Sequence, residues 1–204
     1  MPAAKAVQSY YRLKLDPEKS CAGPNPATGH LEVRHDRNPA FEKGSPMITI
    51  RSATVVDVPL ILQFIRGLAA YEKLLPEVAA TEERLRVTLF PADGRPAAEC
   101  LLAFWQDQPA GFAVFFQSYS TFLAQPGLYL EDLFVEPALR GRGIGQALLL
   151  HCATLANTRG CGRMEWTVLD WNESAKRFYR RFGAAEMDAW CLCRLTGPAL
   201  QKYS

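Results

Sequence analysis

Two adjacent carboxylates, Glu131 and Asp132, lie inside the apolar run LYLEDLFV at residues 128–135. Such a run is typical of a buried strand, where charged side chains are costly unless they serve a purpose. Carboxylates in this position indicate chemistry or a cationic ligand. Because consecutive side chains of a strand point to opposite faces, one carboxylate could face a reacting centre while the other faces elsewhere. A position at an exposed strand edge is the alternative.

A glycine-rich turn, RGRGIG at residues 140–145, follows this strand and opens a helical pattern. Glycines allow several backbone N–H groups to point into one hollow, and the start of a helix attracts anions. The turn therefore suits a pyrophosphate, with Arg140 and Arg142 adding positive charge. Its spacing fits neither the Rossmann fingerprint nor the P-loop. A glycine turn with solvated arginines remains the alternative, and a nucleic-acid contact is a weaker one.

Asn172 and Tyr179 stand seven residues apart in the segment NESAKRFYRRFG, which has helical spacing. Seven residues are close to two helical turns, so both side chains are expected on nearly the same face. A tyrosine is a suitable proton donor for a departing group. On residue type alone, however, a core tyrosine with a solvated hydroxyl is the more frequent case.

The elements that must position these residues follow from hydrophobic spacing and turn residues. Helical spacing predicts helices over residues 55–74, 81–90, 144–157 and 172–183. Alternation predicts strands at 47–53, at 128–135, at 163–170, at 184–195, and twice within 98–118 around a turn at 106–109. This order of elements indicates one mixed α/β domain.

The composition of the 204 residues, 49% hydrophobic and 22% charged, is that of a globular protein. Residues 1–46 are rich in turn residues, lack a hydrophobic period, and are expected to be a disordered extension or an upstream start. The domain is therefore expected at residues 47–204. It carries equal numbers of acidic and basic residues, which argues against a nucleic-acid partner.

The sequence also lacks the signals of several other classes of protein. None of its apolar runs approaches a membrane span, and no signal peptide opens it, so a cytoplasmic protein without a membrane partner is expected. The six cysteines lack metal-ligand spacing, so reduced thiols and no metal site are expected.

Four motifs in this order resemble the GNAT N-acetyltransferase superfamily: LAAYEKL, LYLEDLFV, RGRGIG and WNESAKRFYRRFGA. RGRGIG is similar to the family's acyl-CoA loop, Q/R-x-x-G-x-G/A. The surrounding motifs resemble its diamine (spermidine/spermine) and thialysine acetyltransferase branch, over residues 47–197. The resemblance implies a largely antiparallel sheet of about six to seven strands flanked by helices. It also implies acetyl-CoA as co-substrate, a small-molecule amine as acceptor, and a homodimer.

The resemblance further implies a role for each matching residue. Glu131 would be the general base, acting through water, and Tyr179 the acid that protonates the CoA thiolate. The residues expected to bind acetyl-CoA are Leu133, Phe134, Val135, Arg140, Gly141, Arg142, Gly143, Ile144, Gly145, Gln146 and Asn172. Those expected to bind the amine are Tyr71, Glu72, Asp132 and Trp171.

A base is useful because an alkyl amine has a pKa near 10.4, so only about one molecule in a thousand is neutral near pH 7.4. The expected reaction is direct attack of a primary amine on the thioester. Polyamine enzymes of the branch tend to carry further acids in the loop before the catalytic strand, but here that loop reads SYSTFLAQPG. A diamine- or polyamine-like amine is the expected acceptor, and thialysine or another amino-acid amine is the alternative. A non-catalytic acyl-CoA sensor and an RNA-binding module are alternatives of other classes.

Overall fold

The computed structural model describes residues 48–203 of the chain. Among these residues, the chain up to Leu169 forms one compact unit, and the chain from Asp170 onward belongs to another. The expected extension, residues 1–46, lies outside the described residues.

The first unit is built on a sheet of five strands in sequence order: β1 (Ile48–Ser52), β2 (Glu99–Trp105), β3 (Gln108–Ser120), β4 (Gln125–Val135) and β5 (Arg163–Glu165). All neighbours pair antiparallel except β4 and β5, which pair parallel. The expected class, a mixed and largely antiparallel α/β fold, is confirmed. The described sheet has five strands, fewer than the six to seven that the resemblance implied.

The connection between β2 and β3 is a tight hairpin, as the turn residues predict. Gln106 and Asp107 both have positive φ, 49° and 61°. Two successive residues in the left-handed region match the right-handed twist of the flanking strands. The hairpin places Trp105 at the strand end that lies beside β1, where it pairs with Ile48.

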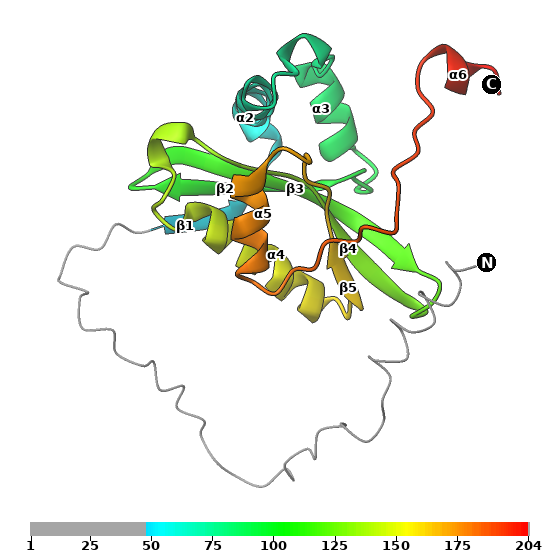
Figure 1. Ribbon diagram of the computed structural model, residues 1–204. Coiled ribbons are helices and arrows are strands. Elements are labelled where there is room, and N and C mark those ends of the chain that lie inside the picture. Colours follow the sequence, from blue (N-terminus) through cyan, green and yellow to red (C-terminus); the bar gives the residue numbers. More distant parts are fainter. Residues whose placement is uncertain (1–47, 204) are drawn as a thin grey trace, which may run out of the picture. The chain divides into compact units, whose positions relative to one another are not determined.

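Two layers of helix cover the sheet (Figure 1). The helices α2 (Val58–Tyr71) and α3 (Glu82–Leu89) lie on one side, and α4 (Ile144–Thr158) lies on the other. Single 3-10 turns precede or follow them at Val55–Asp57, Leu75–Glu77 and Pro137–Leu139. The three helices occupy the segments in which helical spacing predicts them.

The start of α2 is fixed by a buried carboxylate. Asp57 accepts two hydrogen bonds from the Arg51 guanidinium, at 2.8 and 2.7 Å, and further bonds from the backbone N–H and the hydroxyl of Thr54. The Arg51 hydrogen bonds, with those of Thr54, hold the pKa of Asp57 well below its usual range. The charge is buried but fully partnered, which ties β1 to α2.

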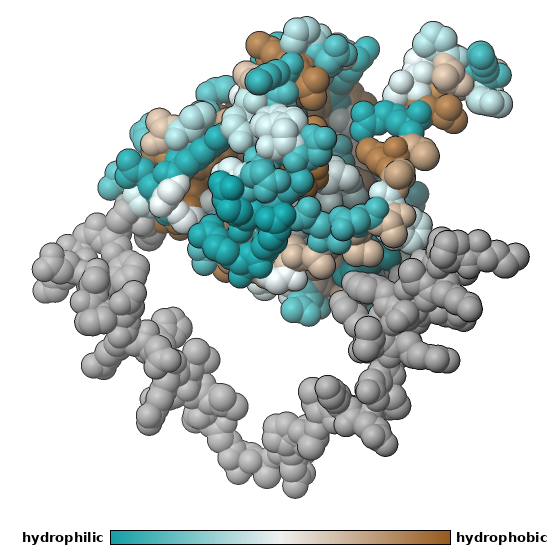
Figure 2. All heavy atoms as spheres, viewed as in Figure 1, coloured by the Kyte–Doolittle hydropathy of each residue, from teal (hydrophilic) through white to brown (hydrophobic). Residues whose placement is uncertain are grey.

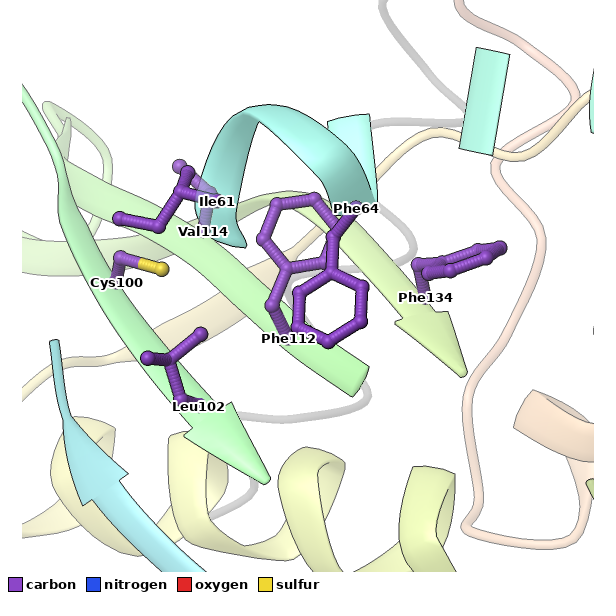
Figure 3. Packing of buried hydrophobic residues seen from close by; sticks show 7 residues of the cluster. All are labelled: Ile61, Phe64, Cys100, Leu102, Phe112, Val114 and Phe134. Atoms are coloured by element: carbon purple, nitrogen blue, oxygen red, sulfur yellow. The ribbon is translucent and has the colours of Figure 1, made fainter. Parts of the chain in front are cut away.

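The core between α2 and the sheet is aromatic at its centre (Figure 3). The Phe64 ring stacks on Phe112 with centroids 5.6 Å apart, and Phe134 meets Phe112 edge-on at 6.4 Å. Gly67 lets α2 approach the sheet closely, because a Cβ there would lie 2.9 Å from the Phe134 ring. The opposite face of the sheet is covered by buried residues of α4, among them Ile144, Leu148 and Cys152.

The second unit contains α5 (Glu173–Arg180) and a short C-terminal helix, α6 (Pro198–Gln201). Asn172 caps α5 by accepting a hydrogen bond from the Ala175 N–H, and Gly183 has a φ of +81° just after the helix, as the sequence predicts. Hydrophilic residues gather over α5 in Figure 2. Some of them form ion pairs along the helix and with Glu186.

The strand expected at residues 184–195 is not present in the structure. Its apolar side chains, Trp190, Leu192 and Leu195, are exposed. Alternating apolar residues favour a strand only where a neighbouring strand completes the ladder. None of the five described strands pairs with this segment.

Candidate active site

A β-bulge in β4 lies at the candidate general base. Val114 of β3 stands opposite Asp132, and Phe115 stands opposite Leu130, so Glu131 is an extra residue without an opposite partner. A bulge bends its strand and redirects its side chains, and bulges are frequent next to active sites. Glu131 is exposed at this point.

The bulge also changes which faces the neighbouring side chains occupy. In an unbroken strand, Leu130 and Asp132 would share a face. Here they stand opposite adjacent residues of β3, so they lie on opposite faces of the sheet. The strict alternation assumed from the sequence for Glu131 and Asp132 therefore does not hold across the bulge.

Asp132 lies on the face that α2 covers, in an acidic environment. Burial, followed by repulsion from Glu131 and Glu72, raises the pKa of Asp132 to about 6. Burial also raises the pKa of Glu72, which directly follows the last residue of α2 as its C-cap. The structure thus brings together the three carboxylates that the sequence assigns to the site. Such a cluster favours a cationic ligand, because a cation would offset the repulsion.

The edge of β4 beside β5 is paired over only part of its length. The parallel ladder runs from Gly127 to Tyr129 of β4. Beyond Tyr129, no strand among residues 48–203 pairs with this side of β4. The open edge includes Leu133, Phe134 and Val135, whose backbone was expected to hold the pantetheine arm. An unpaired strand edge offers N–H and C=O groups to an extended ligand.

The glycine turn has the geometry of an anion site. Gly141 and Gly143 have φ values of +79° and +83°, which side chains rarely adopt. A Cβ would meet nothing within 4 Å at Gly141, and only Ile48 at 3.9 Å at Gly143, so the turn is open. The helix α4 begins directly afterwards. The N–H groups of its first turn, Ile144, Gly145 and Gln146, have no acceptor within the helix and point out of its end.

The two arginines of the turn contact different parts of the first unit. The Arg140 Nε donates to the carbonyl of Val135 at 3.0 Å, and its guanidinium lies 4.4 Å from the centre of the Tyr71 ring. The Arg142 guanidinium lies 5.3 Å from the Trp105 ring. The sequence predicts both arginines as charges near a phosphate, but it does not predict these stacking partners.

Three further predicted site residues, Trp171, Asn172 and Tyr179, belong to the second unit. Burial raises the pKa of Tyr179 to about 12, so its hydroxyl stays protonated at neutral pH. Its ring meets Phe178 at 5.2 Å. The Asn172 side-chain oxygen serves as the cap of α5, and Trp171 is half exposed. A common site for these residues and Glu131 stays a prediction.

No group of three or more His, Cys, Asp or Glu side chains among residues 48–203 is arranged to hold a metal ion. The helices of the same residues all fall short of the length and apolarity that a bilayer crossing requires.

The sheet, the bulged strand and the glycine turn before α4 agree with the fold that the sequence resemblance implies. The profile described as "Acetyltransferase (GNAT) family" matches residues 67–184. The chain belongs to this family, and it is an N-acetyltransferase, an enzyme that acts on amino groups.

Its relatives include a thialysine acetyltransferase, as the sequence motifs indicate, and an ornithine acetyltransferase. The chain is 36% identical to the thialysine N-epsilon-acetyltransferase of Bos taurus, with 77% of this chain and 97% of the relative covered. It is 34% identical to an L-ornithine N5-acetyltransferase of Arabidopsis thaliana, covering 74% and 86% respectively. Among solved structures, an integron cassette protein from the mobile metagenome of V. cholerae is similar, with a TM-score of 0.63 and 29% identity, covering 76% of this chain and 96% of that protein.

Proposed function

We propose that this protein transfers the acetyl group of acetyl-CoA to a primary amine of a small molecule by direct attack on the thioester. The observation that carries the proposal is the bulge of β4, which exposes Glu131 where the ladder to β5 has ended. The same strand continues into the glycine turn and the open N-terminus of α4. One short segment therefore supplies a base, an open strand edge and an anion site.

The residues of the first unit bind and orient the two substrates. The N–H groups of Ile144, Gly145 and Gln146, with the open turn at Gly141 and Gly143, suit a pyrophosphate. Arg142 adds positive charge to the turn. The open edge at residues 133–135 suits the pantetheine arm, and one of its N–H groups can polarise the thioester carbonyl.

Proton movement is assigned to one residue from each unit. Glu131 is exposed, so a water molecule can carry a proton from the substrate ammonium group to its carboxylate, and the neutral amine then attacks the thioester. Tyr179 stays protonated at neutral pH and is assigned as the donor to the departing thiolate. Asn172 is assigned to the pantetheine arm through its side-chain N–H₂, since its oxygen caps α5.

The substrate is proposed to be a short amine that carries a second charged group. Glu72 and Asp132 form an acidic site for an ammonium group, with Tyr71 beside them and Trp171 assigned to the same role. Two relatives are named for ornithine and thialysine, which are amino acids with a side-chain amine. The absence of acids in the sequence from Ser118 to Gly127 makes a long polyamine the weaker candidate.

An acetylation screen tests this proposal. The full chain is incubated with acetyl-CoA and, in turn, ornithine, lysine, thialysine, diamines and spermidine, and the products are weighed by mass spectrometry. We expect a gain of one acetyl group on the side-chain amine of at least one short substrate. Tight binding of acetyl-CoA without turnover of any amine would instead support a sensor.

A further inference from the structure

The Arg140 side chain connects three parts of the first unit. Its Nε donates to the Val135 carbonyl at the end of β4, and its guanidinium lies over the ring of Tyr71, the last residue of α2. The same guanidinium lies 5.8 Å from the centre of the Phe134 ring. One exposed side chain thus connects the glycine turn, the end of β4 and the end of α2.

These contacts depend on shape as well as on charge. A guanidinium is planar, stacks on aromatic rings and donates from Nε at a fixed angle, whereas a lysine ammonium is a point charge that cannot reproduce this arrangement. The groups that Arg140 contacts, a backbone carbonyl and two aromatic rings, carry no net charge. Its geometry therefore indicates a role in holding the elements together.

We infer that Arg140 is a positioning residue for the amine substrate. It fixes the last turn of α2, which carries Tyr71 and Glu72, against the end of β4. Phe134 packs against α2 one turn earlier, at Gly67, and Leu68 packs on the same core, so Arg140 adds a contact at the outer end of the last turn. The catalytic meaning of this contact rests on the proposed acetyl transfer to an amine.

The test separates an effect on the amine from an effect on the cofactor. Arg140→Lys keeps the charge of the acyl-CoA turn but removes the planar stack and the Nε hydrogen bond. We expect KM for the amine to rise roughly tenfold, since small displacements of positioning groups have large effects. The dissociation constant of acetyl-CoA, measured by calorimetry, should change by less than about threefold. A change of that size corresponds to the energy of about one exposed stacking contact.

Two comparisons support the assignment. Arg159→Lys is the matched control, because Arg159 also stacks on a ring, Phe115, and pairs with a carboxylate, Glu99, outside the proposed site. It should leave the amine KM unchanged.

Tyr71→Leu should raise the amine KM, whereas Tyr71→Phe, which keeps the ring, should retain most of the affinity for the amine. In the double variant with Arg140→Lys, the effect of Tyr71→Leu should largely disappear.

A measurement without turnover completes the test. Hydrogen exchange at residues 68–74 should quicken in Arg140→Lys and stay as in the parent in Arg159→Lys. If the parent acetylates no amine, the proposed function fails, but the exchange result still decides the role of Arg140. Unchanged exchange in Arg140→Lys, or a loss of acetyl-CoA affinity as large as the rise in amine KM, would overturn the inference and indicate a phosphate contact.

Discussion

At the scale of single residues, the site contrasts two carboxylates that are neighbours in the chain. Glu131 is exposed on the bulge, whereas burial and two neighbouring carboxylates raise the pKa of Asp132 to about 6. The exposed group suits proton exchange with water. Asp132, which is partly buried, stays ionised near pH 7.5 at a cost in stability, which an ammonium ligand would offset.

The raised pKa of Asp132 predicts that the stability of the folded protein depends on pH. The folded protein binds this proton more tightly than the unfolded chain, whose Asp pKa is near 3.8, so the free energy of unfolding falls as pH rises between about 4 and 6. Asp132→Asn removes this term and should stabilise the protein by about 2–3 kcal/mol at pH 7.5. Urea unfolding at pH 5 and 7.5 measures the difference between variant and parent.

The control for that experiment is Asp188→Asn, an exposed aspartate of the second unit. Its stability should follow that of the parent at both pH values. A constant difference between Asp132→Asn and the parent from pH 4 to 7.5 would contradict the raised pKa.

Tyr179 and Glu131 should differ in their effect on the pH profile. Tyr179→Phe removes only the hydroxyl, so we expect the chemical step to slow by at least ~10²-fold while acetyl-CoA affinity stays near normal. Glu131→Gln should lose most activity at low pH and recover part of it at high pH, because more amine then arrives neutral. Single-turnover rates from pH 6 to 9.5 measure both. Turnover by Tyr179→Phe at the parent rate would mean that another donor protonates the thiolate.

At the scale of elements, the sequence predicts what depends on local spacing. The helices α2, α3, α4 and α5, the β2–β3 hairpin and the glycine turn all occur where spacing and turn residues place them. The bulge at Glu131 was not predicted, because an extra residue in a strand is defined by its partner strand, which lies elsewhere in the chain. The same reason explains the missing strand at residues 184–195.

The direction of Arg140 shows a second limit of prediction. A basic residue in a glycine turn is expected near a phosphate on charge alone. Its stacking on Tyr71 depends on where α2 ends relative to β4, which is a tertiary property. A ring at the end of one helix and an arginine in a distant turn carry no shared pattern in the sequence.

Variants of the turn before α4 can distinguish a role in anion binding from a role in packing. Gly143→Asp introduces a negative charge beside the open N–H groups and should weaken CoA binding by at least ~10²-fold, while pantetheine, which lacks the pyrophosphate, loses much less. Gly143→Asn is the matched control, since it has the same shape and tolerates a positive φ. It should lose far less affinity for CoA. Calorimetry with both ligands measures these changes, and equal losses for CoA and pantetheine would indicate a packing defect.

At the scale of the whole molecule, part of the chain lies outside the regions that match the acetyltransferase family and its relatives. The thialysine N-epsilon-acetyltransferase of Bos taurus is covered over 97% of its length by 77% of this chain. The family profile falls within residues 67–184, and the first described strand begins at Ile48. Part of this chain therefore covers almost the whole length of that relative.

We accordingly predict that residues 1–46 are dispensable for folding and catalysis. A chain that starts at Met47 keeps β1, its ladder to β2, and the Arg51–Asp57 pair that fixes α2. Its Tm should stay within about 4 °C of the full chain, which corresponds to a change in stability below about 1 kcal/mol. Its activity on the preferred amine should also persist. A chain that starts at Ala53 lacks β1 and Arg51, leaves the Asp57 carboxylate without its partner, and should unfold at a clearly lower temperature. Aggregation of the chain that starts at Met47, or a Tm as low as that of the shorter chain, would show that residues 1–46 are part of the folded enzyme.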